Sequence, residues 1–191
     1  MKLKFATSNP HKVEEARLVL EPYGFELDTF PHKGTEIQEE DVIKVVKYAA
    51  DHLPAQEGIG LILEDSGLYI NALDGFPASY SSYIFKTLGV EGILRLLEDS
   101  SDRSAHFDSA VALKFGNEVR VFTGRVYGHI SKFPKGSSGF GFDPIFVPEG
   151  YSMTLGELSI EEKCRISHRG LALRRLAAWL RAAEDECPSN Q

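Results

Sequence analysis

The stretch LILEDSGL, residues 61–68, decides the fold of this chain. Its apolar half predicts a buried strand that ends in two adjacent acids, Glu64 and Asp65, and the following Ser66 and Gly67 predict a turn. A bare carboxylate at a strand end costs free energy unless it is solvated, capped or paired with a cation. Since successive strand residues point to opposite faces, we expect the two acids to do different jobs.

Two interpretations of this acid pair stay open on the residues alone. Asp65 can cap the Ser-Gly turn through an Asx motif. Alternatively, the pair can supply a Mg²⁺ ligand and a base for water, since Mg²⁺ prefers carboxylates, water and substrate phosphate oxygens. A further acid, Glu36 in GTEIQEED, precedes a predicted helix, and a surface charge is the favoured interpretation for it.

Outward from this stretch, the hydrophobic period alternates between strand-like and helix-like segments. The predicted strands are residues 2–7, 25–30, 60–63, 106–115 and 118–130, and residues 68–73 can continue the sheet. The predicted helices run from Ser8 to a stop at Gly24, over residues 39–53 and 89–99, after a capping box of Ser159 and Glu162, and after a cap at Ser167. Gly116-Asn117 predicts a hairpin turn, and residues 132–144 a loop rich in glycine and proline.

The order of these elements predicts an α/β fold with a mixed sheet. An α/β half is followed by a β-rich insertion and by closing helices, and the length suits one domain or at most two small lobes. We expect one domain over residues 1–184 and a frayed C-terminal tail over residues 185–191.

The composition of the 191 residues narrows the class of partner. A net charge of −7 argues against a large nucleic-acid footprint, which needs a basic stripe, but leaves room for a small anionic ligand. No apolar stretch reaches the length of a membrane helix, and the N-terminus lacks the apolar region of a signal peptide. Two cysteines, Cys164 and Cys187, make no disulfide framework, so we expect a cytoplasmic protein.

The segment TSNPHK, residues 7–12, is a candidate phosphate-binding turn. It joins a predicted strand to a predicted helix, where unpaired backbone N–H groups and the helix dipole favour an anion. Thr7, Ser8 and Asn9 add polar donors, and Lys12 adds a positive charge. The alternative is that Ser8 or Asn9 only caps the helix.

Two further segments carry residue types that suit a nucleotide base. In SGFGFDP, residues 138–144, the faces of Phe140 and Phe142 can stack on a flat heterocycle, although plugging the core is the favoured interpretation in isolation. In EEKCRISHRG, residues 161–170, Lys163, His168 and Arg169 cluster close to helix starts, although a cap with solvated charges is the favoured interpretation in isolation.

Together and in this order, TSNPHK, EDSGLYINAL-x-GFP, GFGFDPIF and EEKCRISHRG-x-AL make the chain resemble the inosine triphosphate pyrophosphatase family, also called Ham1-like. The resemblance extends from about Lys2 to Leu180. It implies an elongated, two-lobed single domain with a central cleft, and a homodimer. It also implies Mg²⁺-dependent hydrolysis of noncanonical purine nucleoside triphosphates (dITP, ITP and XTP) to the monophosphate and pyrophosphate, which removes them from the nucleotide pool.

The resemblance also assigns residues. Asp65 is implied as proton acceptor, and metal contacts are implied for Asp65, Glu36 and the neighbouring Glu64. Implied substrate-binding residues are Thr7, Ser8, Asn9, Pro10, His11, Lys12, Ser66, Phe140, Gly141, Phe142, Asp143, Lys163, His168 and Arg169. The chain departs from the family at Pro77-Ala78, where Pro-Gly is common, and near Ser82, where an arginine is common.

Base selection is expected to follow from hydrogen-bond type. Donors from His168, Arg169 or the backbone suit the C6 oxygen of hypoxanthine and xanthine, and adenine, with an amino group there, leaves them unpaired at a cost of roughly 1–3 kcal/mol. Three alternatives stay open: a pyrophosphatase for other modified nucleotides, a phosphatase that releases orthophosphate, and a nucleotide-sensing module that does not cleave.

Overall fold

The structure is a computed structural model that describes residues 2–32, 34–35 and 37–186. Its strands are β1 (Lys2–Ala6), β2 (Leu27–Phe30), β3 (Ile59–Ile70), β4 (Pro77–Ala78), β5 (Ser104–Phe115), β6 (Glu118–Ile130) and β7 (Phe146–Pro148). Its helices are α1 (Pro10–Leu20), α2 (Val42–His52), α3 (Ser81–Thr87), α4 (Gly89–Leu96), α5 (Ile160–Ile166) and α6 (His168–Glu186). No helix in these ranges is long and apolar enough to cross a membrane.

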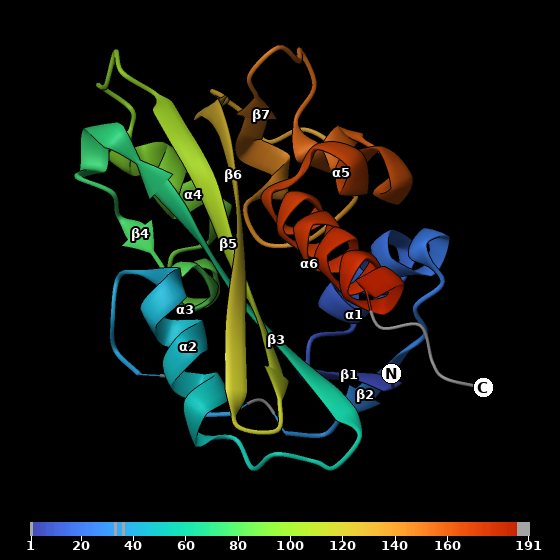
Figure 1. The fold of residues 1–191 in the computed structure, drawn as a ribbon. Coiled ribbons are helices and arrows are strands. Elements are labelled where there is room, and N and C mark those ends of the chain that lie inside the picture. Colours follow the sequence, from blue (N-terminus) through green and yellow to red (C-terminus); the bar gives the residue numbers. More distant parts are fainter. Residues whose placement is uncertain (1, 33, 36, 187–191) are drawn as a thin grey trace.

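Within the described ranges, the strands form one mixed sheet, which confirms the predicted α/β class. The strand order is β2-β1-β3-β5-β6-β7, and the short β4 pairs with the far end of β3. The contacts of β1 with β2 and β3 are parallel, while β3, β5, β6 and β7 are joined antiparallel. Figure 1 shows β3, β5 and β6 as long strands that run the whole length of the elongated molecule.

The predicted turn at Ser66 and Gly67 is wrong, because β3 runs unbroken from Ile59 to Ile70. Glycine is needed in this strand for a different reason. A Cβ atom on Gly67 would lie 2.5 Å from the carbonyl oxygen of Ala78, so the backbone of β4 can approach β3 only where no side chain intervenes. The acid pair therefore lies in the middle of a strand and not at its end.

The edge of β3 that faces away from β5 has a gap in its pairing. On this edge, β1 pairs with Ile59–Ile62 and β4 pairs with Leu68 and Tyr69, which leaves residues 63–67 without a strand partner among the described residues. Because the edge is open there, side chains from both faces of β3 reach one space. This explains how Glu64 and Asp65 can point to opposite faces and still line the same cavity.

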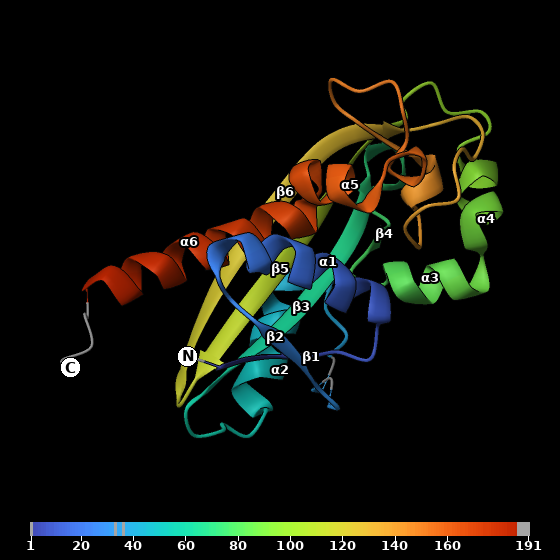
Figure 2. The same ribbon diagram turned by 90° about the vertical axis from the view of Figure 1, so that its right-hand side faces the viewer.

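The core is divided between the two ends of the molecule, which accounts for the two lobes. Around the parallel strands, α1 and α6 pack on one face of the sheet and α2 packs on the other. At the far end, α4 and the segment 142–158 cover the same face as α6. Figure 2 shows α1 and α6 on one side of the strands and α3 and α4 beyond the open edge.

Most predicted elements are present, and the differences lie at segments with weak patterns. The hairpin turns at Gly116-Asn117, α5 begins with the predicted capping box, and Ser167 Oγ accepts a hydrogen bond from Gly170 at the start of α6. Helix α3 was not predicted. Helix α6 extends to Glu186, and the rest of the expected tail lies outside the described residues.

Candidate functional site

A cavity of about 630 Å³ lies beside the open edge of β3, between the two lobes. It collects the predicted site residues Thr7, Ser8, Asn9, His11, Lys12, Glu64, Asp65, Ser66, Phe140, Gly141, Phe142, Asp143, His168 and Arg169. Of the other predicted residues, Pro10 and Lys163 do not line it, and Glu36 lies outside the described residues. Segments that are far apart in the sequence thus meet in one place.

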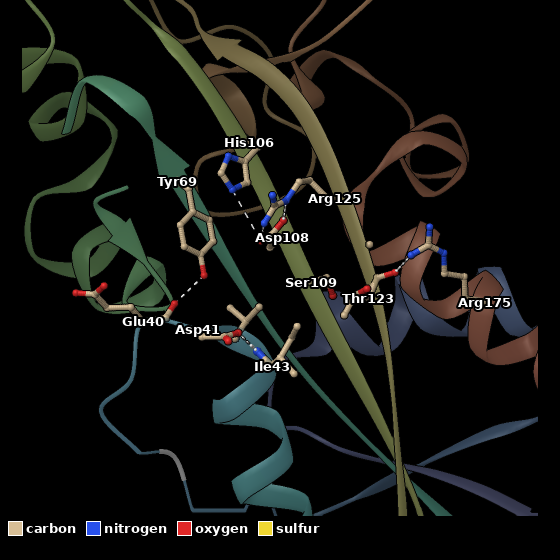
Figure 3. Close-up of a pocket in the computed structure, with 12 residues that line it drawn as sticks. Glu40, Asp41, Ile43, Tyr69, His106, Asp108, Ser109, Thr123, Arg125 and Arg175 are labelled. Carbon is tan, nitrogen blue, oxygen red and sulfur yellow. Dashed lines mark hydrogen bonds and ion pairs between the residues drawn. The ribbon is translucent and has the colours of Figure 1, made fainter. Parts of the chain in front are cut away.

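A second cavity, of about 520 Å³, lies on the face of the sheet that α2 covers only in part (Figure 3). None of the predicted site residues lines it. Two of its charged side chains pair with each other, since Arg125 donates to both oxygens of Asp108 at 2.6 and 2.5 Å, and the ring of His106 stacks on Tyr69. The cleft beside β3 is therefore the candidate active site.

The turn between β1 and α1 has the geometry of a capped helix start. The side chain of Asn9 accepts hydrogen bonds from the backbone N–H groups of His11 and Lys12 at 3.0 and 3.4 Å, and Thr7 Oγ1 accepts one from Asn9. The predicted cap is thus confirmed. The cap and the cavity coexist, because the same residues also line the cleft.

Glu64 is buried between two cations and a hydroxyl group. Its Oε2 lies 2.8 Å from Nζ of Lys12, and its Oε1 lies 3.1 Å from Nε of Arg169 and accepts from Ser109 Oγ at 2.8 Å. Burial alone would raise the pKa of this carboxyl, but Arg169 and Lys12 outweigh burial and hold the pKa far below its usual range. Glu64 therefore stays ionised and is engaged on its own face of β3, while Asp65 lines the cleft from the other face.

Behind the cleft, buried ion pairs continue to a residue that the sequence analysis did not identify. Glu15 of α1 is only 2% exposed, and its two oxygens lie 2.6 Å from Lys163 Nζ and 2.6 Å from Arg169 Nη1. Lys163 also lies 2.6 Å from Asp143. In the sequence, Glu15 follows Glu14 in a polar run and has no feature that separates it from a surface acid.

The two phenylalanines of the predicted base loop have different environments. Phe142 is 2% exposed, belongs to the core of the far lobe and packs edge-on against Phe85. Phe140 is half-buried, with the His11 ring stacked on it at 5.3 Å and the cations of Lys163 and Arg169 at 4.7 and 5.1 Å from its centroid. Both rings line the cavity, and Phe140 is the more exposed of the two.

Asp143 holds the loop around Phe140 in shape. Its Oδ2 accepts a hydrogen bond from the backbone N–H of Phe140 at 2.7 Å and is the atom that Lys163 contacts. The intervening Gly141 has a φ of 63°, and a side chain there would meet no atom within 4 Å. This glycine is thus required by the backbone conformation and leaves open space beside the loop.

His168 is a neutral group at the wall of the cleft. Burial, reinforced by the nearby Arg169, holds the pKa of its imidazole well below the usual value. Its Nδ1 is buried and has no hydrogen-bond partner in the described part of the chain. An unsatisfied polar atom beside a cavity is expected where a ligand completes the bonding.

Helix α3 contributes the far wall of the cleft, which the sequence analysis missed. Tyr80, Ser82, Tyr83, Phe85 and Lys86 line the cavity from this side. The helix has no side-chain cap at its start, and most of its residues are exposed, so neither its periodicity nor its boundaries were visible in the sequence.

The donor set suits a hard cation that brings its own water and phosphate ligands. Among the described residues, no group of three or more His, Cys, Asp or Glu converges on one point, as a zinc cage would require. Mg²⁺ is typically bound by only one or two carboxylates together with substrate phosphates and water. The carboxylate of Asp65, in the same cavity as the Thr7–Lys12 turn, fits that requirement.

Comparisons with known proteins agree on one family. The model of the Ham1 family matches residues 3–179. A relative from Thermococcus kodakarensis named dITP/XTP pyrophosphatase is 50% identical over 95% of this chain and 98% of its own length, and one of the same name from Pyrobaculum aerophilum is 43% identical over 94% and 96%. The solved structure of a HAM1 protein from Coxiella burnetii has a TM-score of 0.83 at 31% identity and covers 95% of this chain and 99% of its own.

Proposed function

This chain belongs to the Ham1 family, and we propose that it hydrolyses noncanonical purine nucleoside triphosphates (dITP, ITP and XTP) to the monophosphate and pyrophosphate. The observation that supports this most is the joining, in one cleft, of the Thr7–Lys12 turn, the carboxylate of Asp65 and the base loop around Phe140. The names of relatives with up to 50% identity over nearly the whole chain give two of these substrates, dITP and XTP.

At the phosphate end, the substrate places its triphosphate against the Thr7–Lys12 turn. Lys12 shares its charge between Glu64 and the incoming phosphates, which allows an acidic protein to bind a polyanion. Asp65 orients or deprotonates the attacking water. Bound Mg²⁺ would neutralise charge on the phosphates and the leaving pyrophosphate, held by Asp65 and by Glu36, the latter a prediction outside the described residues.

At the base end, Phe140 stacks on the purine, and the buried donors read its edge. The neutral His168 has an unsatisfied ring nitrogen, and the C6 oxygen of hypoxanthine or xanthine can satisfy a donor that adenine cannot. Discrimination built on hydrogen bonds can be large, since the wrong base leaves buried groups unpaired. By this route the enzyme would remove deaminated purines from the nucleotide pool.

The assembly and location of the enzyme are further parts of the proposal. We expect a homodimer, which light scattering coupled to size-exclusion chromatography would detect as twice the mass of 21.2 kDa. We also expect it to work in the cytoplasm. Cys164, a cysteine with no disulfide partner in the described ranges, agrees with a reducing compartment.

The identity of the products tests the proposed reaction. Purified protein is incubated with ITP and Mg²⁺, and the products are separated by ion-exchange chromatography. IMP with pyrophosphate supports the proposal, whereas IDP with orthophosphate indicates a stepwise phosphatase, and binding without cleavage indicates a sensing module. Modified pyrimidine triphosphates are tested in the same assay, and their lack of hydrolysis would exclude a pyrophosphatase of broader specificity. Full activity in excess chelator would contradict the Mg²⁺ hypothesis.

A further inference from the structure

Six charged side chains of alternating sign form a continuous line through the wall of the cleft and the core behind it. The line, which we call the buried charge network, consists of Asp143, Lys163, Glu15, Arg169, Glu64 and Lys12. Successive members lie between 2.6 and 3.1 Å apart, and three negative charges balance three positive ones. One end holds the base loop, and the other end is the lysine of the phosphate-binding turn.

Glu15 is the centre of this network. It is the carboxylate that joins the two cations next to Phe140, with one oxygen on Lys163 and the other on Arg169, each at 2.6 Å. Burial alone would raise the pKa of Glu15, but the charges of Arg169 and Lys163 outweigh burial and lower it, so the bridge stays ionised. An anion between two buried cations attracts both and offsets their mutual repulsion, and therefore Glu15 fixes their separation.

Glu15 also ties the base end of the cleft to its phosphate end. It lies one helical turn after Lys12 on α1, where residues three apart are neighbours on one face. Lys12 contacts Glu64, Glu64 contacts Arg169, and Arg169 contacts Glu15, so the contacts close a ring through a rigid helix. A shift of the base-reading cations relative to the phosphate-binding turn would have to break this ring.

We propose that Glu15 is a positioning residue for base discrimination, which sets where Lys163, Arg169 and the ring of Phe140 stand relative to the triphosphate. This inference rests on the proposed function of the cleft. Glu15 itself does not line the cavity and does not touch substrate. Loss of its bridging charge should let the two cations move apart, so that donors meet the C6 oxygen poorly and the advantage of hypoxanthine over adenine shrinks.

The test compares Glu15→Gln and Glu15→Asp with a matched control, Glu14→Gln. Glu14 is the neighbouring acid on the same helix, is exposed and lies outside the network, so its variant makes the same change in net charge. For each protein, kcat/KM is measured with dITP and with dATP, and inhibition is measured with IMP and with pyrophosphate. The thermal midpoint of unfolding reports on the fold.

We expect Glu15→Gln to narrow the ratio of kcat/KM for dITP over dATP by roughly tenfold or more, since this discrimination depends on buried hydrogen bonds. Inhibition by IMP should weaken while inhibition by pyrophosphate changes little, and Glu14→Gln should behave as wild type. If Glu15→Gln does not fold, the same ratio is measured for Glu15→Asp. Aspartate keeps the negative charge, but its shorter side chain cannot contact both cations.

Two results would overturn the inference. One is an unchanged dITP to dATP ratio in a folded Glu15 variant, with both substrates slowed by the same factor, which is the signature of a merely structural residue. The other is a loss of pyrophosphate inhibition equal to the loss of IMP inhibition. A wild-type enzyme without any preference for dITP over dATP would refute the proposed function. If the wild type prefers dITP and the Glu15 variants show the same preference, only the role of Glu15 is refuted.

Discussion

The ring of His168 lies parallel to the ring of Phe107, with 4.5 Å between centroids and 9° between planes. This contact packs the imidazole against the core and away from water, which disfavours its charged form. Three cations, Arg169, Lys163 and Lys12, act in the same direction, and the carboxylate of Glu64 opposes them. The lowered pKa of His168 therefore follows from how the ring is packed.

The stability of the protein should fall as the pH drops below about 6.5, the ordinary pKa of histidine. The unfolded chain takes up a proton there and the folded chain does not, so acid favours unfolding by up to about 1.4 kcal/mol per pH unit for this group. The free energy of urea unfolding is measured between pH 7.5 and pH 5 for wild type and His168→Gln. The difference between them should shrink with acid, and a constant difference would contradict the buried neutral ring.

Asp65→Asn should lower kcat by at least about 10²-fold, the low end for a positioned general base. The change keeps the shape of the side chain and removes the charge that orients water. Circular dichroism and the thermal midpoint should confirm that the variant is folded. Hydrolysis of ITP at a rate close to wild type would remove Asp65 from the mechanism.

The two phenylalanines of the base loop should fail in different ways. Phe142→Ala empties a core position and should cost about 3–5 kcal/mol of unfolding free energy. Phe140→Ala should keep more of the stability and weaken the binding of all purines alike, since stacking contributes about 1–3 kcal/mol per base and is blind to exocyclic groups. Urea unfolding measures the loss of stability in each variant, and steady-state kinetics with ITP and ATP measures the loss of purine binding. A selective loss for ITP in Phe140→Ala would show that the loop reads the edge.

Lys86 of α3 is expected to bind phosphate. In the described part of the chain, it is the one lysine or arginine lining the cleft that has no carboxylate partner, since Lys12 and Arg169 are both in ion pairs. Lys86→Ala should raise the KM for ITP by about tenfold with little change in kcat, and should weaken inhibition by pyrophosphate. Lys47→Ala, an exposed lysine of α2 outside the cavity, is the control. If both variants raise the KM for ITP equally, Lys86 acts only through the overall charge of the protein and does not bind phosphate directly.

Ala78→Gly should stabilise the protein by about 1 kcal/mol. Ala78 has a φ of 53°, a left-handed conformation that costs a residue with a Cβ atom roughly 1–2 kcal/mol, and glycine avoids most of this cost. Ala49→Gly in the middle of α2 is the matched control and should destabilise by about 1 kcal/mol. Urea unfolding measures both, and a destabilised Ala78→Gly would show that the methyl group contributes more through packing than it costs in strain.

The fold was predictable where the pattern of apolar residues was regular. The β5–β6 hairpin, α2 and the capped start of α5 follow directly from period, turn residues and capping box. The unbroken course of β3 was not predictable, because Ser66-Gly67 has the composition of a turn. Only the approach of β4, whose backbone takes the place of a side chain at Gly67, explains the glycine.

The site was predictable to the extent that its residues belong to recognisable segments. The Thr7–Lys12 turn, the acid pair and the base loop do meet in one cleft. Glu15 was missed because its burial depends on Lys163 and Arg169, which lie at the other end of the chain. No local pattern around a glutamate in a helix predicts such distant partners.

The buried charge network also has a consequence for how the protein is made. Glu15 and Glu64 leave the ribosome long before Lys163 and Arg169, the cations that neutralise them. A nascent chain that ends ahead of α5 would have to bury these carboxylates without those partners, which is strongly unfavourable. We therefore expect the cleft to close around its charges only when translation is nearly complete, so that an interrupted chain yields no partly assembled enzyme to act on the cell's ordinary nucleotides.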